Sequence, residues 1–388
     1  MRRGQLRLLF CIKALNNPGG GAERVFADVV NGLAERGHEV TALTFEEPGG
    51  RSFYPIAGSV PRIDLGIGST TGKATVVPTL RRIGSLRGRI LAHEPDVVIA
   101  FMHSMFLPLG LALAGTGVPV IASEHIVPQH YRDRPLQRVL LQTAPRLVDV
   151  ITCVSEQARD LFPQRLQAIM RVVPNPVVMK AGNRADVLGE SGHHKTLLSV
   201  GRLTDQKDHA TLIRAFAEIA DDVPDWRMKI VGEGELEEQL RALVASTGLA
   251  DRIELPGAEQ DIARSYANSQ LFVLPSLYES FGLTLIEALA HGLPCVGFAD
   301  CPGVNELIEH ETNGILVQPK PDRVTALANT LKGVMLDAGT RRRLASAPFS
   351  VPEKYRLPNV LDAWETLIDW VRARRGAARK SRAARLGA

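Results

Sequence analysis

Residues 274–288 read LPSLYESFGLTLIEA, and this stretch joins a buried strand to a helix. The apolar run that ends at Pro275 predicts a strand, and the apolar periodicity from Leu283 onward predicts a helix that begins there. In the first turn of that helix the amides of Gly282, Leu283 and Thr284 have no helical acceptors, so they can bind an anion. The stretch therefore predicts a phosphate-binding turn at the carboxyl end of a strand.

Two carboxylates flank this turn, Glu279 in the loop and Glu287 about one turn into the helix. Glu287 can accept hydrogen bonds from ribose hydroxyls, as an acidic residue does in dinucleotide-binding folds, and Glu279 can reach a sugar hydroxyl. Two carboxylates beside a phosphate site are unfavourable for the fold alone, unless a ligand with several hydroxyl groups donates hydrogen bonds to them. The alternative is a helix N-terminus whose acidic residues only complement the helix dipole. We take Phe281 and its neighbours through Glu287 as candidate donor-binding residues.

Strands and helices alternate on both sides of this stretch throughout the second half of the chain. Apolar runs predict six strands, at 195–200, 227–231, 252–255, 271–274, 294–298 and 314–317. The helices after them are expected to begin near Asp208, Glu235, Asp261, Leu283, Val304 and Asp322. Six strands at this spacing, each followed by a helix, predict a doubly wound parallel sheet of the α/β class.

The first half shows the same pattern less regularly. Strands are expected at 6–13, 38–45, 96–101, 118–123, 150–154 and 171–173, with a helix at 23–36 and a loop insertion at 49–72. Residues 105–122 carry no charge, but prolines and glycines interrupt them, so they predict a short helix, a turn and a buried strand rather than a membrane span. The first half is therefore a second Rossmann-like domain.

Domain boundaries follow from breaks in this pattern. Pro174-Asn175-Pro176 and the polar stretch 181–195 predict a linker, so the domains are expected at 1–175 and 176–352. The apolar face of a helix at 353–375 is expected to pack back on the first domain, and 376–388 is a basic tail. Two such sheets would face each other across a cleft lined by the carboxyl ends of their strands, where ligands bind.

Charge and cysteine content exclude several classes of protein. The net charge of +4 comes from the last residues, since Arg372 to the end holds seven basic residues and no acidic one. A basic body and stacking aromatics for nucleic acid are absent. The tail is either a solvated terminus or a contact for anionic phospholipid.

Four dispersed cysteines without a C-x-x-C pair predict reduced core thiols and a cytosolic protein.

A second candidate site lies where the run 195–200 ends, at Gly201, Arg202 and Lys207. An arginine can bind two oxygens in a fork and a lysine supplies a point charge, so this pair suits a diphosphate. The alternative is two solvated loop cations.

Glycines follow three further strands at positions where a backbone could approach a ligand closely. They are Gly232 and Gly234 after 227–231, Pro256-Gly257 after 252–255, and Gly20 and Gly21 between 6–13 and 23–36. Main-chain groups near Gly257 could read a nucleobase edge, and amides near Gly20 could bind an anion. The alternative for each is a plain tight turn.

Taken in order, these segments resemble the retaining GT-B glycosyltransferases of family 4. The resemblance covers roughly residues 6–320 and rests on GGAER, GR followed by QK, GEG, E-x-F-G-x-x-x-x-E-A and NGILV. It implies that Arg202 and Lys207 contact the donor diphosphate, Glu287 the ribose and Glu279 the transferred sugar. Gly20 and Gly21 would lie near phosphate and acceptor.

The resemblance also implies an active-site histidine after a strand of the first domain. His125 in the sequence Ser-Glu-His fits that position best, and His103 at another strand end is a rival. The segment DCPGVNE at 300–306 departs from the commoner Gly-Gly-x-x-Glu form, which leaves Gly303 a weaker donor-site candidate.

The resemblance implies transfer of a sugar from a nucleotide-sugar, with a UDP-sugar favoured, to a glycan or a polyprenyl-diphosphate-linked acceptor. Arg202, Lys207 and the helix amides would stabilise the negative charge on the departing nucleoside diphosphate. No metal or other cofactor is expected. The enzyme would act in cell-surface polysaccharide or glycolipid synthesis, in the cytoplasm or peripherally on the inner face of the plasma membrane. Three alternatives stay open: a GT-B sugar-nucleotide epimerase, a phosphorylase, and a non-catalytic sugar-nucleotide-binding protein.

Overall fold

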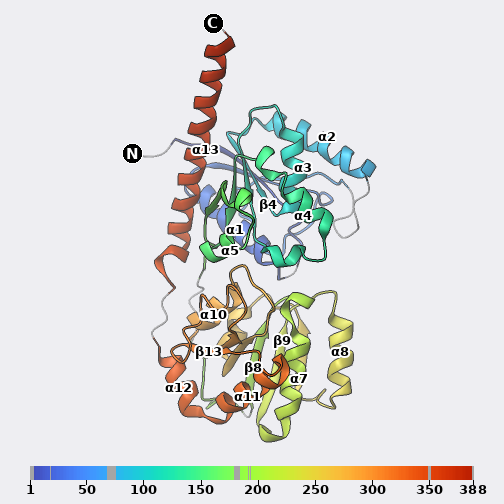
Figure 1. The fold of residues 1–388 in the computed structure, drawn as a ribbon, viewed down its shortest axis with the longest axis vertical. Coiled ribbons are helices and arrows are strands. Elements are labelled where there is room, and N and C mark those ends of the chain that lie inside the picture. The colour runs from blue at the N-terminus through green and yellow to red at the C-terminus, as the bar shows by residue number, and fades with distance from the viewer. Residues whose placement is uncertain are drawn as a thin grey trace. The chain divides into compact units, whose positions relative to one another are not determined.

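The computed structural model describes residues 4–17, 19–67, 76–178, 184–190, 192, 194–347 and 351–386, with the backbone alone for 76–82 and 378–386. The chain divides into two compact units (Figure 1). Unit 1 comprises Met1–Pro176 together with Glu353–Ala388, and unit 2 comprises Val177–Pro352. Each unit is an α/β body with its own parallel sheet.

The sheet of unit 1 has seven strands in the order β3-β2-β1-β4-β5-β6-β7, and every pairing is parallel. The strands are β1 (Arg7–Cys11), β2 (Glu39–Thr44), β3 (Arg62–Asp64), β4 (Val97–Phe101), β5 (Val120–Ser123), β6 (Val150–Cys153) and β7 (Met170–Val172). The chain winds outward from β1 in one direction and then returns to β4 on the other side. The carboxyl ends of β1 and β4 therefore flank the topological switch point, where ligands bind in such sheets.

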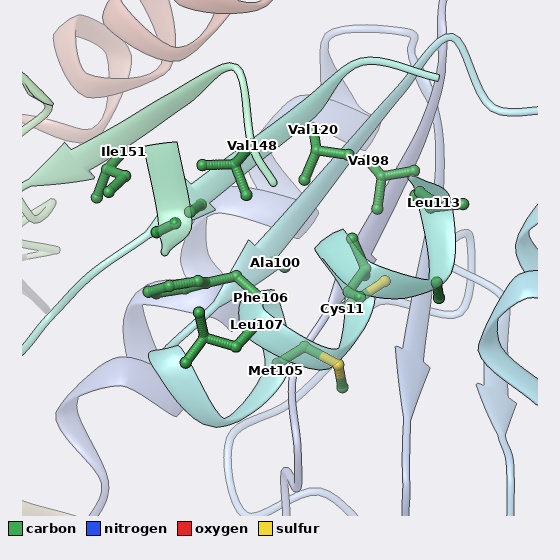
Figure 2. Packing of buried hydrophobic residues seen from close by; sticks show 14 of the residues in the cluster. Cys11, Val98, Ala100, Met105, Phe106, Leu107, Leu113, Val120, Val148 and Ile151 are labelled. Atoms are coloured by element: carbon green, nitrogen blue, oxygen red, sulfur yellow. The ribbon is translucent and has the colours of Figure 1, made fainter. Parts of the chain in front are cut away.

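Helices cover both faces of this sheet. On one face lie α1 (Gly21–Glu35) and α13 (Leu357–Leu386), which run side by side (Figure 1). On the other face α2 (Val76–His93) and α3 (His103–Leu113) close the main core cluster, which includes Met105 and Phe106 of α3 together with Ala100 and Val120 of the strands (Figure 2). The shorter helices are α4 (Pro135–Leu141), α5 (Glu156–Asp160) and α6 (Gln164–Gln167), with 3-10 turns η1 (Pro128–Tyr131), η2 (Ala144–Arg146) and η5 (Glu353–Tyr355).

The sheet of unit 2 has six parallel strands in the order β10-β9-β8-β11-β12-β13. They are β8 (Lys195–Val200), β9 (Trp226–Val231), β10 (Ile253–Gly257), β11 (Leu271–Leu274), β12 (Cys295–Phe298) and β13 (Gly314–Val317). The helices are α7 (His209–Ile219), α8 (Glu237–Ser246), α9 (Ile262–Ala267), α10 (Leu283–Ala290), α11 (Arg323–Leu336) and α12 (Ala338–Ser346), with 3-10 turns η3 (Asp205–Lys207) and η4 (Ala220–Asp222). The switch point here lies between β8 and β11.

The structure confirms the predicted fold class, two Rossmann-like parallel-sheet domains, and corrects three predicted elements. The helix predicted at 353–375 continues as α13 to Leu386, so most of the predicted tail at 376–388 is helical. Residues 49–72 are not all loop, because β3 forms within them and pairs with β2; residues 68–72 lie outside the described part. The helix expected near Val304 is wrong, since residues 302–307 form turns only. The linker predicted at 181–195 falls partly outside the described residues as well.

Two further expectations concern the core. The uncharged stretch 105–122 folds as most of α3, a turn and β5, as predicted, and no described helix is long and apolar enough to cross a membrane. The four cysteines are free and buried. Burial raises the pKa of the Cys153 thiol to about 12, so it is protonated and unreactive at neutral pH.

Candidate active site

In unit 2 the loops after β8 and β11 are joined by an ion pair. Nζ of Lys207 lies 2.5 Å from Oε1 of Glu279, and the hydroxyl of Ser276 donates to the same oxygen at 2.6 Å. Glu279 is 5% exposed, so the pair is largely shielded from water. The residues expected to contact diphosphate and sugar thus meet directly, although 72 positions separate them in the sequence.

The same two loops are tied by their backbones. The amide of Leu277 donates to the carbonyl of Gln206 at 2.9 Å, and the Gln206 side chain donates back to the carbonyl of Tyr278 at 2.9 Å. From α11, Arg323 donates to the carbonyls of Pro275 and Ser276 at 3.0 and 3.1 Å. These bonds fix the loop that carries Glu279 before any ligand binds, which is the preorganisation a binding site requires.

Arg323 is itself held on three sides. Its guanidinium lies 3.6 Å from the ring centroid of Phe298, and it forms ion pairs with Asp300 at 3.1 Å and Asp208 at 3.4 Å. Burial raises the pKa of the Asp208 carboxyl, and the Arg323 charge acts in the opposite direction. Nothing in the sequence singled out this arginine, because its partners come from three distant segments.

The first turn of α10 is open for an anion. Gly282 is the N-cap with φ of +74°, and no side chain caps the helix. The Oγ1 atom of Thr284 is buried and has no hydrogen-bond partner in the described part of the chain. An uncapped helix start with an unsatisfied hydroxyl suits a phosphate, and phosphate binding here stays a prediction.

Glu287 is held from behind by a residue that the sequence did not indicate. The hydroxyl of Tyr266 in α9 lies 3.1 Å from Oε2 of Glu287 and 3.2 Å from the carbonyl oxygen of Thr284. Tyr266 is 1% exposed, and its ring stacks on His291 at 5.3 Å between centroids. Protein groups therefore already bind both glutamates, which corrects the expectation that only a polyhydroxyl ligand would satisfy them.

The glycines of unit 2 permit close packing of its loops. A Cβ at Gly232, whose φ is +147°, would lie 2.0 Å from the carbonyl oxygen of Gly201, and one at Gly234 would lie 2.3 Å from that of Leu203. The loops after β8 and β9 could not approach otherwise. These glycines therefore have a packing role, whatever ligand their backbones contact.

Three further candidates lie at the same edge. Arg202 is exposed and has no ion pair among the described residues, so its guanidinium is available at the carboxyl end of β8. Pro256 is exposed near the end of β10, and Gly257, with φ of +87°, accepts a hydrogen bond from Gly232. Arg202, the open start of α10 and the two glutamates thus lie on the loops and the helix that follow the strands of one sheet.

In unit 1 His125 is the predicted histidine, and the structure fixes its ring firmly. The ring stacks on Phe101 at 5.0 Å between centroids, and Nε2 lies 2.9 Å from the hydroxyl of Ser123. Burial lowers the pKa of His125 to about 4, with the side chain of Asn175 acting in the opposite direction. The imidazole is therefore neutral at physiological pH and can take part in hydrogen bonds without charge.

His103 belongs to a different network. Its Nδ1 lies 2.8 Å from the hydroxyl of Tyr131, which donates to Oε2 of Glu124 at 2.9 Å. The other oxygen of Glu124 accepts the amides of His125 and Ile126 at 3.0 and 3.1 Å. Burial raises the pKa of Glu124 to about 7 and lowers that of His103 to about 4. The two rival histidines are thus connected through Glu124.

The glycine loop of unit 1 is occupied by the protein itself. Gly20 is the N-cap of α1, yet the carboxylate of Glu23 lies over it, 2.1 Å from where a Cβ would stand, and accepts from Asn17 at 2.9 Å. Gly21 opens the helix. A phosphate at this helix start would have to displace the Glu23 carboxylate.

Two units with doubly wound sheets, a glycine-lined helix start and buried glutamates are typical of nucleotide-binding α/β proteins. No group of three or more His, Cys, Asp or Glu side chains that could hold a metal occurs in the described ranges. Comparison with known families then divides the chain much as the two units do. Residues 19–180 match the model "Glycosyltransferase Family 4", and residues 183–348 match "Glycosyl transferases group 1".

Similar proteins agree with this match. An uncharacterized glycosyltransferase of Haemophilus influenzae is 26% identical over 355 residues, 90% of this chain and 96% of the relative. N-acetyl-alpha-D-glucosaminyl L-malate synthase of Bacillus anthracis is 25% identical over 90% of this chain and 93% of its own. Anabaena Alr3699/HepE, solved with UDP and glucose, superposes with a TM-score of 0.76 at 20% identity, over 94% of this chain and all of that one. The chain belongs to the family 4 glycosyltransferases and has the GT-B fold.

Proposed function

We propose that this glycosyltransferase uses a UDP-sugar and transfers the sugar with retention of configuration, without a metal. The observation that carries the proposal is the Lys207–Glu279 pair beside the uncapped start of α10. Lys207 and the amides would stabilise the diphosphate, Glu287 would bind the ribose, and Glu279 the sugar. A UDP donor is further supported by the complex of Anabaena HepE with UDP and glucose.

In the proposed reaction the oxygen of the acceptor hydroxyl bonds to C1 of the sugar as the bond from C1 to the diphosphate oxygen breaks, and the hydroxyl proton passes to the departing diphosphate. The donor diphosphate would form an ion pair with Lys207 and weaken the pair of Lys207 with Glu279. The Glu279 carboxylate could then accept a hydrogen bond from a sugar hydroxyl. A covalent intermediate would need a carboxylate beside C1. Since no residue of the sequence is clearly that nucleophile, we propose direct transfer on one face of the sugar.

A thermal-shift screen against UDP-, GDP- and ADP-sugars tests the donor. We expect UDP-sugars to raise the unfolding temperature of the wild type and of Glu238→Ala, an exposed control in α8, but much less that of Glu287→Ala. No shift with any nucleotide, or an equal shift in Glu287→Ala, would refute the site. Turnover that survives chelation of divalent cations, and an NMR assignment of the product anomer, test metal independence and retention.

The acceptor we propose is a glycan or a polyprenyl-diphosphate-linked sugar of surface polysaccharide or glycolipid synthesis, reached at the inner face of the membrane. The basic tail would contact anionic phospholipid there, since each basic residue near such a surface contributes about 1 kcal/mol. Removing 376–388 should then weaken vesicle binding and leave turnover of a soluble acceptor unchanged. Epimerised donor without acceptor, or a requirement for inorganic phosphate, would instead indicate an epimerase or a phosphorylase. UDP binding without any turnover would indicate a binding protein.

A further inference from the structure

Helix α4 of unit 1 turns three large apolar side chains to the outside. Leu136 is 71% exposed, Val139 60% and Leu140 44%. Their spacing of three and four positions places them on one side of the helix, and Leu141 on another side is buried in the core at 4%. A surface helix of a protein surrounded only by water normally exposes polar residues at such positions.

Exposed arginines lie close to this apolar stripe in the sequence. Arg132, Arg134 and Arg138 are all exposed, and Asp133 is the one acidic residue between positions 128 and 146. Arg134 contacts Nε2 of His130 at 2.8 Å, whereas Arg132 and Arg138 make no ion pair within the part of the chain that the structure describes. We define Arg132, Arg134, Leu136, Arg138, Val139 and Leu140 as the α4 surface.

The α4 surface is held in place by its flanks. Tyr131 before it and Ala144 after it are 1% and 0% exposed, and both belong to the main core cluster. The Tyr131 hydroxyl is fixed between His103 and Glu124. The apolar stripe is therefore presented outward by a firmly packed segment and does not fold back onto the protein.

We propose that the α4 surface docks on a bilayer that contains anionic phospholipid. Leucine and valine side chains would enter the boundary between headgroups and acyl chains, and the arginines would extend to lipid phosphates. A second copy of the chain fits poorly, because a twofold contact would set the arginines of one surface against those of the other. The inference is independent of the donor, of the acceptor and of the basic tail.

Sedimentation of the full-length protein with phosphatidylcholine vesicles, with and without phosphatidylglycerol, tests the proposal. We expect binding only to the anionic vesicles. Leu136→Ser with Val139→Ser should lower the partition coefficient at least tenfold, and Arg132→Gln with Arg138→Gln should lower it about fivefold for each charge. A chain ending at residue 375 should retain this dependence on α4, which separates the α4 surface from the tail.

Matched controls lie in unit 2. Leu336 is 59% exposed at the end of α11, and Arg214 and Arg342 are exposed arginines, so Leu336→Ser and the pair Arg214→Gln with Arg342→Gln should bind like the wild type. Unchanged unfolding temperatures show that each variant is folded. Equal vesicle binding by α4 variants and controls would overturn the proposal, as would failure of the wild type to bind anionic vesicles. A loss of dimerisation in the α4 variants without loss of vesicle binding would assign the surface to a second copy instead.

Discussion

At the scale of single residues, the second glutamate of the donor site depends on a tyrosine from another helix. Tyr266 reaches from α9 to both Glu287 and the carbonyl of Thr284, so its hydroxyl joins the two ends of the first turn of α10. A carboxylate held by such a bond has one orientation before the ligand arrives, and the ligand then loses less free energy in ordering it. Tyr266 is thus a positioning residue for ribose binding.

Removing this hydroxyl should weaken donor binding more than it slows chemistry. We expect Tyr266→Phe to raise KM for the nucleotide-sugar about five- to tenfold, as for the loss of one hydrogen bond worth about 1 kcal/mol, with kcat little changed. For a donor that lacks a ribose hydroxyl, the KM values of the variant and the wild type should differ less. Tyr355→Phe, a buried tyrosine of unit 1, is the control. A fall in kcat at constant KM would contradict this role.

Glu124 is the residue for which the structure predicts a clear pH effect. Burial raises its pKa in the folded protein to about 7 from an ordinary value of 4.5. The folded state therefore binds the proton more tightly than the unfolded chain, and this contribution to stability is present at low pH and is lost as pH rises through about 7. At about 1.4 kcal/mol per pKa unit the loss amounts to about 3 kcal/mol.

The buried histidines act with the opposite sign, since the pKa values of His103 and His125 are lowered to about 4 and stability from them rises with pH up to about 6.5. The variant Glu124→Gln keeps both histidines, so the difference between wild type and variant excludes the histidine contribution. The free energy of unfolding of the wild type, measured with urea relative to this variant, should fall as pH rises from about 5 to about 8. A difference that is independent of pH would show that Glu124 does not titrate in this range.

At the scale of elements, the turn after β12 supports the loop that carries Glu279. Gly303 has φ of +78°, and a Cβ there would lie 3.0 Å from the carbonyl oxygen of Glu279 and 3.1 Å from the amide nitrogen of Phe281. The departure of this segment from the commoner family sequence made it a weak candidate, yet its backbone packs directly on the donor loop. The amide of Glu279 also donates to Pro302 at 3.1 Å.

Gly303→Ala should therefore affect both stability and donor binding. The left-handed backbone alone costs a non-glycine residue about 1–2 kcal/mol, and relief of the contacts would move Glu279 and Phe281. We expect a lower unfolding temperature and a raised KM for the donor. Gly333→Ala is the matched control, because Gly333 is exposed within α11 with nothing within 4 Å and should gain up to about 1 kcal/mol. Equal behaviour of the two variants would contradict the argument.

Elements buried on both faces were predictable from the sequence, and elements held by polar contacts were not. β11 is an unbroken apolar run, LFVL, as a central parallel strand requires. β3 reads RID and is held by ion pairs of Arg62 with Asp64 and Glu46, so it has no apolar signal. Near Val304 the apolar residues have helical spacing, but a glycine with positive φ and close packing of Val304 on Gly297 keep the segment to turns.

The candidate site was predictable to the same extent. Glycines, prolines and helix starts indicated which strand ends carry it, because these are local signals. The partners of its charged groups come from distant segments: Lys207 binds Glu279, Tyr266 binds Glu287, and Arg323 binds the loop at Pro275. No spacing within one segment could indicate such pairs.

At the scale of the whole molecule, the last segment of the chain completes the first unit. Gly32 of α1 allows α13 to approach closely, since a Cβ there would lie 2.6 Å from Leu361. Arg36 pairs with Asp362 and Glu365 at 2.7 and 3.0 Å. Residues more than 300 positions apart therefore form one body, and unit 1 cannot fold completely until α13 has been synthesised.

Trp364 extends this dependence to the candidate histidine. Its ring stacks on Phe101 at 6.1 Å and 18°, and Phe101 stacks on His125 at 5.0 Å and 17°. Trp364 is 2% exposed, so Trp364→Ala would leave a large cavity beneath this stack. We expect unit 1 to lose about 3–5 kcal/mol and His125 to lose its fixed orientation.

Hydrogen exchange resolved by peptide can measure this prediction in each unit separately. In Trp364→Ala, protection should fall along β1, β4 and α1 of unit 1 and stay unchanged in β8, β9 and β11 of unit 2, because each unit has its own core. Trp370→Ala, at 39% exposure on the same helix, is the control and should alter neither pattern. An equal loss of protection in both units would mean that they unfold as one cooperative body, and the division of stability argued from α13 would then be wrong.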